Sequence, residues 1–247
     1  MTTAIPEAGR PVAVVTGAGG GIGYAIVRRL LDEDYFVNGW DVAPGRLGEI
    51  DDSNFSISIV DVRNKASVDR AVQQLHQAVG RIDGLVACAG VYKAMPFLDL
   101  DEATWDHTLA VNLKGSFFAC QAVLPAMRRR RSGSIVLFSS TLARIGAARG
   151  AHYAATKGGL LGLARSLALV AAPDNVRVNT ISPGVTDTAM PREHATDADL
   201  EAVARTIPLG RIGRPEDMAE AALFLLGHDS SFVSGQDLRV NGGALIF

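Results

Sequence analysis

The sequence predicts an α/β fold in which a parallel sheet is covered by helices on both faces. Short apolar, β-branched segments alternate with longer segments whose apolar residues recur at helical spacing. The first strand-like segment also runs directly into a glycine-rich turn and a helical pattern, the order found in nucleotide-binding units. The 247 residues are enough for one such domain with an ample core. We therefore expect residues 1–247 to form a single Rossmann-fold domain, with a flexible N-terminus at residues 1–10.

The first unit of this alternation has the features of a dinucleotide site. Val12–Thr16 is a β-branched run that predicts a buried strand, and a helical pattern begins at Ile22. Between them, Gly17, Gly21 and Gly23 permit a tight turn and close approach of the backbone to a ligand. The N–H groups at the start of the helix would then face a pyrophosphate.

The second strand-like segment predicts which dinucleotide binds. Residues 35–40 are followed by Asp41, close to the offset of about 20 residues at which a carboxylate accepts hydrogen bonds from the adenosine ribose. A carboxylate at that point repels a 2′-phosphate, so Asp41 favours NAD. Arg46 lies in the loop beyond Asp41 and is the residue that would instead accept the phosphate of NADP. NAD is the expected cofactor and NADP the alternative.

The chemistry is indicated by Tyr153 and Lys157. Residues four apart on a helix share one face, so the ammonium would lie about one turn from the phenol. A neighbouring cation stabilises the phenolate and lowers a pKa that is ordinarily near ~10. A phenol tuned in this way exchanges a proton with an alcohol or a carbonyl near neutral pH.

The remaining segments continue the alternation. Strand-like segments are expected at residues 56–60, 82–88, 134–139, 176–181 and 237–240. Helical patterns are expected near residues 65–79, 104–130, 153–170 and 215–226. The run Arg128–Arg131 follows an apolar helix and is expected to be a solvated helix C-terminus.

Taken in order, these motifs resemble the classical short-chain dehydrogenase/reductase family over nearly the whole chain. The matching segments are the turn at residues 16–23, Asn112 within residues 111–115, Ser140 at the end of residues 134–140, the Tyr153-x-x-x-Lys157 pair, and residues 183–188. The resemblance implies a seven-stranded parallel sheet in the order 3-2-1-4-5-6-7. It also implies a catalytic tetrad of Asn112, Ser140, Tyr153 and Lys157. Ser139 is the competing serine, but the spacing to Tyr153 favours Ser140.

The family pattern also implies further cofactor contacts. They are Gly17, Gly21, Ile22, Gly23, Asp41, Asp61, Val62, Ala89, Gly90, Asn112, Tyr153, Lys157, Pro183, Gly184, Val185 and Thr188. One segment departs from the pattern, because Ala87-Cys88 stands where the family has two asparagines. The first of these asparagines ties neighbouring strands together, so its loss is expected to affect local stability more than catalysis. Cys88 is expected to be a small buried hydrophobe.

Composition limits the partners. A net charge of −2 gives no reason to expect nucleic-acid or membrane binding. Two cysteines indicate a reducing compartment, and the first residues lack the apolar core of a signal peptide, so a cytoplasmic location is expected. The histidines show no metal-ligand spacing, and no metal is expected. A mean hydropathy of +0.17 and apolar helices at 104–130 and 153–170 indicate buried subunit interfaces. The resemblance implies a homotetramer or homodimer.

The substrate is the least defined part of the prediction. Residues 186–207 are polar and are expected to form a lid over a small substrate. The expected pocket lining is Tyr92, Leu142, Ala143, Arg144, Ala148, His152 and Met190. Arg144 could pair with a substrate carboxylate, with a solvated loop arginine as the alternative.

These residues are compatible with three functions. The first is an NAD-dependent dehydrogenase of a small secondary alcohol, such as a cyclic diol, polyol or other hydroxy compound. The second is an NADPH-dependent ketoreductase of the 3-oxoacyl-carrier-protein reductase type, against which Asp41 argues. The third is a non-catalytic dinucleotide sensor, which the presence of Ser140, Tyr153 and Lys157 disfavours.

Overall fold

A seven-stranded parallel sheet forms the centre of the molecule in the computed structural model, which describes residues 9–246. The strands are β1 (Val12–Thr16), β2 (Phe36–Asp41), β3 (Phe55–Ile59), β4 (Gly84–Ala87), β5 (Gly133–Phe138), β6 (Val176–Pro183) and β7 (Asp237–Val240). Their order is β3-β2-β1-β4-β5-β6-β7, and every neighbouring pair is parallel. The predicted Rossmann topology is confirmed.

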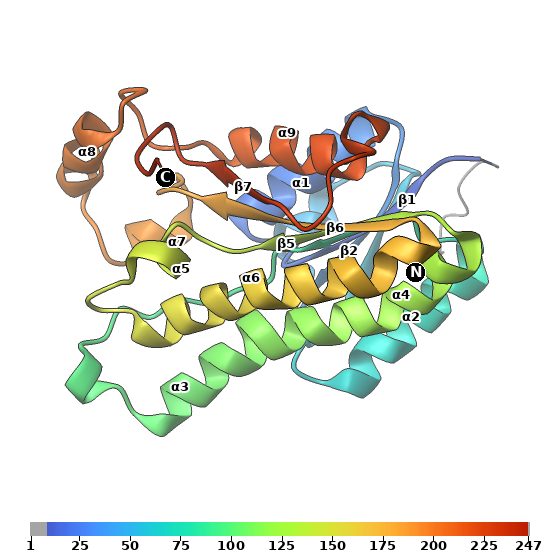
Figure 1. The fold of residues 1–247 in the computed structure, drawn as a ribbon, viewed down its shortest axis with the longest axis horizontal. Helices are drawn as coiled ribbons and strands as arrows, with labels where there is room; N and C mark the ends of the chain where they lie inside the picture. The colour runs from blue at the N-terminus through green and yellow to red at the C-terminus, as the bar shows by residue number, and fades with distance from the viewer. Residues whose placement is uncertain (1–8, 247) are drawn as a thin grey trace.

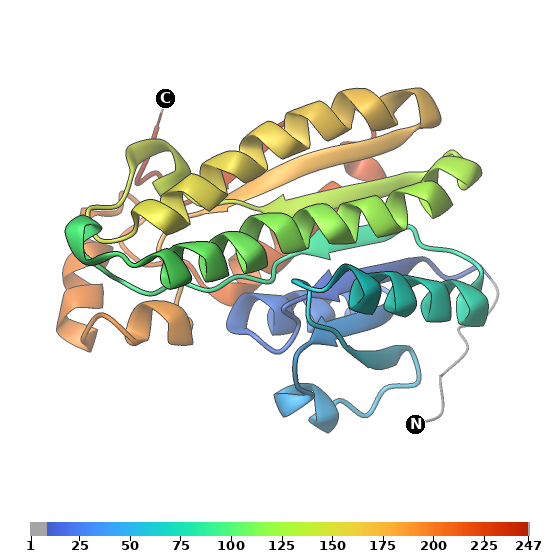
Figure 2. The ribbon, with the colours of Figure 1, turned by 90° about the horizontal axis from the view of Figure 1, so that it is seen from below.

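Helices cover both faces of this sheet, as Figures 1 and 2 show. The helices are α1 (Gly21–Asp32), α2 (Lys65–Val79), α3 (Glu102–Leu109), α4 (Ser116–Arg130), α5 (Leu142–Ile145), α6 (Ala151–Ala171), α7 (Ala189–Arg192), α8 (Asp197–Thr206) and α9 (Pro215–Leu226). Helices α1 and α9 pack on one face, and α2, α4 and α6 pack on the other.

The two cores follow from the alternation of side chains along each strand. On β5, Ile135 and Leu137 enter the core under α2, α4 and α6, whereas Val136 and Phe138 enter the core under α1 and α9. Strands buried on both faces read as continuous apolar runs, which is why the sequence located them well. The short helices α5, α7 and α8 gather at one end of the sheet, where the carboxyl ends of the strands lie (Figure 1).

Two predicted elements differ from the structure. The helix expected at 104–130 is α3 and α4 joined by a π-helical segment, Ala110–Gly115, which the apolar pattern does not reveal. The strand expected at 82–88 is limited to Gly84–Ala87. The arginine run is exposed at the C-terminal end of α4, as predicted, and there Arg128 and Arg131 pair with Asp174 and Arg130 pairs with Asp83.

The polar stretch at 186–207 contains two short helices, α7 and α8. Thr196 accepts a hydrogen bond from the backbone of Asp199, and the Asp199 carboxylate accepts one from the backbone of Thr196, so α8 begins with a capping box. The capping residues Thr196 and Asp199 are three positions apart and so could be recognised in the sequence, although the polar composition of the segment favoured a loop.

Two further expectations concern the N-terminus and membrane-spanning helices. Residues 1–8, most of the expected flexible N-terminus, lie outside the described residues, while Arg10 pairs with Asp34. Within residues 9–246, no helix combines the length and apolar character that a membrane crossing requires.

Candidate active site

The glycine turn after β1 is a backbone cradle that excludes side chains. Gly17 has a φ of +66°, and a Cβ added to Gly23 would lie 2.1 Å from the Gly17 carbonyl oxygen. A Cβ on Gly17 would lie 2.7 Å from Ala89 Cα, so the turns after β1 and β4 touch. Gly20 precedes α1 without a side-chain cap, which leaves N–H groups of the first turn free for a ligand. These features fit a dinucleotide pyrophosphate.

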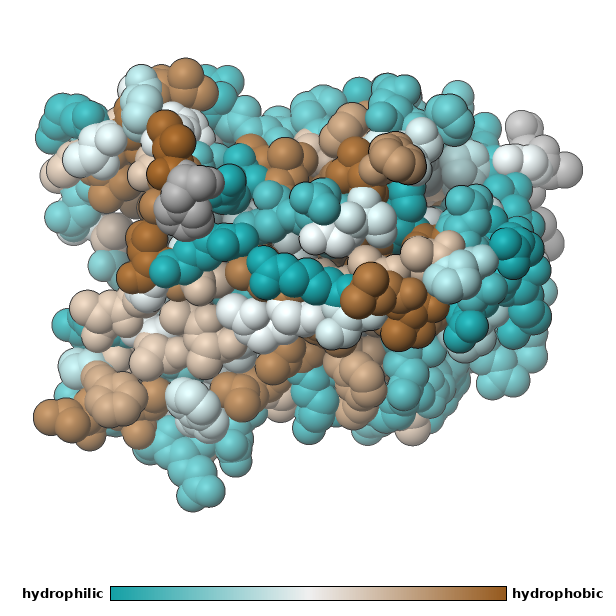
Figure 3. Space-filling model, in the orientation of Figure 1, coloured by the Kyte–Doolittle hydropathy of each residue, from teal (hydrophilic) through white to brown (hydrophobic). Residues whose placement is uncertain are grey.

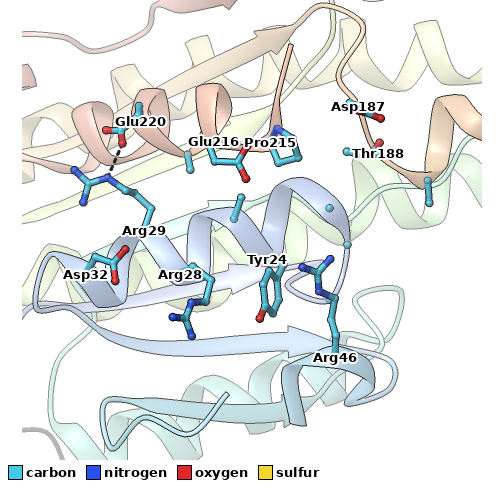
Figure 4. A pocket seen from close by; sticks show the side chains of 16 residues that line it. Tyr24, Arg28, Arg29, Asp32, Arg46, Asp187, Thr188, Pro215, Glu216 and Glu220 are labelled. Carbon is cyan, nitrogen blue, oxygen red and sulfur yellow. Dashed lines mark hydrogen bonds and ion pairs between the residues drawn. The ribbon is translucent and has the colours of Figure 1, made fainter. Parts of the chain in front are cut away.

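A cavity of about 500 Å³ opens beside this cradle, between α1 and α9 (Figure 4). Its inner end is formed by Gly19–Gly21 and Thr188, and its outer end by charged side chains of α1 and α9. Thr188 lies directly over the turn, because a Cβ on Gly21 would lie 2.6 Å from Thr188 Cγ2. Residues 187–189 thus close one side of the cradle.

Asp41 and Arg46 favour different cofactors: Asp41 favours NAD, whereas Arg46 would favour NADP. The Asp41 carboxylate accepts hydrogen bonds from the backbone N–H groups of Gly19 (2.9 Å) and Val42 (2.8 Å), so it is fixed beside the turn. Arg46 is exposed and stacks on the Tyr24 ring, with its guanidinium carbon 3.5 Å from the ring centroid. Figure 4 shows both Tyr24 and Arg46 at the cavity.

Asp61 and Val62 follow β3 at the same edge of the sheet. Asp61 pairs with Arg63 at 2.7 Å, and this hydrogen-bonded ion pair lowers the pKa of the Asp61 carboxyl. Val62 is buried against the π-helical segment, where a Cβ on Gly115 would lie 2.7 Å from Val62 Cγ2. The structure thus joins the predicted adenine-contacting pair to the segment that carries Asn112.

Ser140, Tyr153 and Lys157 come together where β5 ends and α6 begins. The Ser140 hydroxyl lies close enough to the Tyr153 phenol to lower the pKa of that phenol, and the Lys157 ammonium lies 5.3 Å from the Tyr153 ring centroid. Lys157 is buried and donates to the Phe138 carbonyl oxygen at 2.7 Å. Ser139 has a different partner, since its hydroxyl donates to the Lys157 carbonyl oxygen at 2.8 Å. The geometry therefore brings Ser140, rather than Ser139, to the phenol.

Burial dominates the proton equilibria of this trio. It raises the pKa of Tyr153 to about 12, against which the Ser140 hydrogen bond acts. It also lowers the pKa of Lys157 to about 8, because the ammonium is removed from water. The predicted lowering of the Tyr153 pKa by Lys157 is therefore opposed by burial of the phenol, which gives a net upward shift.

Asn112 is fully buried in the π-helical segment and holds the loop after β4. Its side-chain oxygen accepts from the Val91 N–H at 2.8 Å, and its amide donates to the Val91 carbonyl at 3.0 Å and to Thr156 Oγ1 at 3.3 Å. The Asn112 side chain is therefore fully engaged with protein groups. Asn112 links this loop to α6 one residue from Lys157.

The loop after β4 retains its ties despite the Ala87-Cys88 replacement. The Ala89 N–H donates to the Thr16 hydroxyl at 3.1 Å, so Thr16 joins the ends of β1 and β4. Thr16 belongs to the predicted turn at residues 16–23, but its bond to the loop after β4 was not predicted. Gly90 lies beside Asn112 and Lys157, 3.5 Å from either if it carried a Cβ. Cys88 is partly rather than fully buried, and desolvation raises the pKa of its thiol to about 12, so the thiol is unreactive as expected.

Residues 183–188 lie next to the end of β5. The Thr141 N–H donates to the Pro183 carbonyl at 3.0 Å, and the Gly184 N–H donates to the Val240 carbonyl at 3.0 Å. Val185 is 38 % exposed. This loop therefore lies beside Ser140 on one side and beside Thr188 and the glycine cradle on the other, as a nicotinamide-binding loop requires.

Tyr92 is the centre of an aromatic group at the mouth of the site. Its ring lies 5.0 Å from Tyr153, 6.4 Å from His152 and 5.4 Å from His194, centroid to centroid. His152 is fully buried, so the expected contact between His152 and a substrate is not available. His194, which the sequence prediction missed, instead brings the 186–207 segment against Tyr92. The only sequence signal for this contact was the position of His194 in a polar stretch, because ring contacts between distant segments produce no local pattern.

The other predicted lining residues occupy mixed positions. Leu142 and Met190 are partly buried on α5 and α7, and Ala143 and Ala148 lie near the same end of α6. Arg144 is an exposed residue on α5, as the solvated alternative requires, and its guanidinium donates to the Asp237 carboxylate at 3.1 and 3.2 Å. The expectation that Arg144 meets a substrate carboxylate is therefore replaced by an internal ion pair.

Comparison with known proteins places the chain in a family. A family model described as enoyl-(acyl carrier protein) reductase matches residues 17–244. A 3-oxoacyl-[acyl-carrier-protein] reductase of Thermotoga maritima is 35% identical over 246 residues, covering 95% of this chain and 98% of the relative. The chain belongs to the short-chain dehydrogenase/reductase family. It is an oxidoreductase of this family, whose members use nicotinamide cofactors.

Members of this family with other substrates match this chain equally well. A 2-(S)-hydroxypropyl-CoM dehydrogenase of Xanthobacter autotrophicus is 37% identical over 244 residues, covering 94% of this chain and 95% of the relative. The ligand-free structure of an aldohexose dehydrogenase from Thermoplasma acidophilum superimposes with a TM-score of 0.88 at 30% identity, covering 95% of this chain and 94% of that one. The matches therefore span reductases and dehydrogenases, and they leave the substrate open.

Proposed function

We propose that this short-chain dehydrogenase/reductase interconverts a small secondary alcohol and its ketone with NAD as cofactor. The observation that carries the proposal is the meeting of Ser140, Tyr153 and Lys157 beside the glycine cradle. A cyclic diol, a polyol or another small hydroxy compound fits the short segment at 186–207 and its aromatic contact at Tyr92.

In this mechanism Tyr153 is the general acid and base. As an alcohol is oxidised, the phenolate oxygen of Tyr153 takes the hydroxyl proton, and in reduction it returns that proton to the carbonyl oxygen. Ser140 hydrogen-bonds the substrate oxygen and holds it at the phenol. Lys157 supplies a positive charge beside the phenolate, and Asn112 joins the loop after β4 to α6 at Thr156, the residue before Lys157. The bound nicotinamide supplies or accepts the hydride.

The cofactor would lie along the carboxyl edge of the sheet. Gly17, Gly21, Ile22 and Gly23 would face the pyrophosphate, Asp41 the adenosine ribose, and Asp61 and Val62 the adenine. Ala89, Gly90, Pro183, Gly184, Val185 and Thr188 would line the remaining path to the nicotinamide. The Asp41 carboxylate, fixed by two backbone N–H groups, supports NAD because it would repel a 2′-phosphate.

The test is an absorbance assay at the reduced-nicotinamide band with NAD and NADP against a panel of alcohols, diols, sugars and ketones. We expect turnover with NAD and a preference for NAD in kcat/KM. Asp41→Ala should reduce that preference by about 10-fold, while Asp69→Ala on the exposed face of α2 should leave it unchanged. A preference for NADP in the unmodified protein would contradict the cofactor assignment.

A second candidate is an NADPH-dependent reductase of a 3-oxoacyl thioester. The 35% identity to the Thermotoga maritima reductase and the position of Arg46 on Tyr24 support it. Under this alternative, Arg46→Ala should weaken NADP binding by at least 10-fold, and an acyl-thioester ketone should be the best substrate in the panel. Under the NAD proposal, Arg46→Ala has little effect on turnover.

The proposal includes a homo-oligomer, a tetramer or a dimer. Helices α4 and α6 lie side by side on one face of the sheet (Figures 1 and 2), and they expose Phe117, Leu169 and Val170. Figure 3 shows hydrophobic surface in separate patches, one at lower left over the segment before α3, where Leu98 is 94% exposed. Light scattering at micromolar concentration should give a multiple of 26.0 kDa, and a monomer would contradict the proposal.

A further inference from the structure

Asp237, the first residue of β7, carries a buried carboxylate that was not among the predicted site residues. Its side chain is 9% exposed. One carboxylate oxygen accepts from the hydroxyls of Thr180 (2.9 Å) and Ser182 (2.6 Å). The other oxygen accepts from Arg144 Nε (3.2 Å) and Nη2 (3.1 Å). The carboxylate is thus bonded to four donors from α5 and β6.

These donors adjoin two segments of the candidate active site, the one that carries Ser140 and the loop that begins at Pro183. Arg144 belongs to α5, which begins two residues after Ser140, and the Leu142 N–H at the start of α5 donates to Ser140 Oγ at 3.1 Å. Ser182 precedes Pro183, where the loop proposed to hold the nicotinamide begins. The Thr141 N–H also donates to the Pro183 carbonyl, which joins the two segments directly.

Strand pairing alone does not require a carboxylate at this position. Asp237 lies opposite Thr180 in the ladder between β6 and β7, and backbone bonds on both sides of it hold β7 in place: Thr180 N–H to Gln236 O at 2.8 Å, and Gly184 N–H to Val240 O at 3.0 Å. Removing a carboxylate from water is costly unless its hydrogen bonds are replaced. A residue that carries this cost is therefore expected to have a specific positional role.

We propose that Asp237 is a positioning residue, which fixes Ser140 through Arg144 and α5, and fixes the loop beginning at Pro183 through Ser182. Arg144 holds α5 at a set distance from β7, so the Ser140 hydroxyl keeps its place beside the Tyr153 phenol. A hydroxyl displaced by a fraction of an ångström no longer holds the substrate oxygen in line, and turnover falls while substrate still binds. This inference rests on the role proposed for Ser140.

The test separates this role from general stability by using Arg144→Met, which leaves the bonds of Asp237 to Thr180 and Ser182 in place. We expect kcat to fall by about 10-fold, with KM for the substrate and Kd for NAD within about twofold of the unmodified protein. Asp237→Asn should behave in the same way, and combining it with Arg144→Met should cause no further loss. Arg128→Met, which breaks the pair with Asp174 at the end of α4, is the matched control and should keep full activity.

A double-mutant cycle with Ser140→Ala tests the route of the effect. If Arg144 acts through Ser140, Arg144→Met should have no further effect on kcat in the Ser140→Ala background. An equal 10-fold loss in both backgrounds, or an unchanged kcat in Arg144→Met, would overturn the proposal.

A readout that needs no turnover distinguishes failure of this proposal from failure of the proposed function. Hydrogen exchange measured by mass spectrometry should be faster in residues 140–146 of Arg144→Met and unchanged in α1 and β1. Unchanged exchange in residues 140–146 would refute the positioning role whatever the activity. Absence of turnover in the unmodified protein, with faster exchange in the variant, would refute the proposed function alone.

Discussion

The Ser140–Tyr153–Lys157 site and the neighbouring 186–207 segment are held by different interactions. In the site, Lys157 is 4% exposed, and its ammonium and its carbonyl are both bonded to groups at the end of β5. In the segment, Arg192 joins Asp187 and Asp197 in ion pairs in which every side chain is at least 43% exposed. Buried bonds to backbone resist change, whereas exposed ion pairs contribute little. We infer that the buried site fixes the chemistry, and we propose that the exposed 186–207 segment, which can be altered at little cost in stability, determines the choice of substrate.

The largest expected effect comes from removing the phenolic hydroxyl. Tyr153→Phe should lower kcat by about 10²–10⁴-fold, because it removes the group that transfers the proton. Binding of NAD, followed by fluorescence titration, should remain within a few-fold of the unmodified protein. Tyr35→Phe, which precedes the amino end of β2, is the control and should keep normal turnover. Near-normal turnover in Tyr153→Phe would remove the site from consideration.

The buried ammonium predicts a pH dependence of stability. The folded-state pKa of Lys157 is about 8 against an ordinary value of 10.5, so between these values the unfolded chain binds a proton that the folded protein does not. Raising the pH through this range therefore favours the folded state. Relative to Lys157→Met, the free energy of unfolding should rise by about 2 kcal/mol between pH 7 and 9.5.

Denaturant melts of both proteins across this range make the measurement. The raised pKa of Tyr153 destabilises both proteins alike above its ordinary value near ~10, so it cancels in the difference. Parallel pH profiles for the two proteins would show that Lys157 is not held as a buried cation.

The glycine cradle gives the next effect. Gly23→Ala places a methyl group 2.1 Å from the Gly17 carbonyl oxygen, so the turn must open. The free energy of unfolding should fall by about 1–3 kcal/mol, and NAD binding should be lost. Gly48→Ala is the matched control, because nothing lies within 4 Å of its added Cβ. Binding of NAD by Gly23→Ala with unchanged affinity would contradict the proposed position of the pyrophosphate.

The features that could be predicted from the sequence are those formed by residues close together in the chain. The predicted strand Val12–Thr16 and the predicted helix Lys65–Val79 match the structure residue by residue. The strand is buried on both faces and the helix has a clear cap and a glycine end, so each produces a local sequence pattern. The Tyr153–Lys157 pair and the glycine turn were found for the same reason. Each consists of residues at fixed short spacing.

Features made by distant residues were not predicted. The ion pair of Arg144 with Asp237, the contact of His194 with Tyr92 and the engagement of Asn112 with Val91 all join segments far apart in the chain. The hydrophobic periodicity of a sequence does not reveal contacts between distant segments. The pKa of Tyr153 was misjudged because spacing reveals a neighbouring charge but not the loss of water around the phenol.

The smallest effect should come from the segment itself. Arg192→Ala removes both exposed ion pairs, and the free energy of unfolding should fall by about 0.5 kcal/mol or less, with less effect in high salt. Because Asp187 adjoins Thr188 and α7 leads to His194, loss of the pairs should raise KM a few-fold and leave kcat within about twofold. Steady-state kinetics at low and high salt measure both quantities.

Arg205→Ala in the same segment is the control for this variant. Arg205 lies on α8 at 4.0 Å from Glu201, with both side chains more than 70% exposed, so its removal should change neither KM nor kcat. A fall in kcat comparable to that of Tyr153→Phe in Arg192→Ala would show that the 186–207 segment takes part in the chemical step. The division between a fixed chemical site and an adaptable substrate segment would then be wrong, and Asp187 would have to be considered with Ser140 and Tyr153.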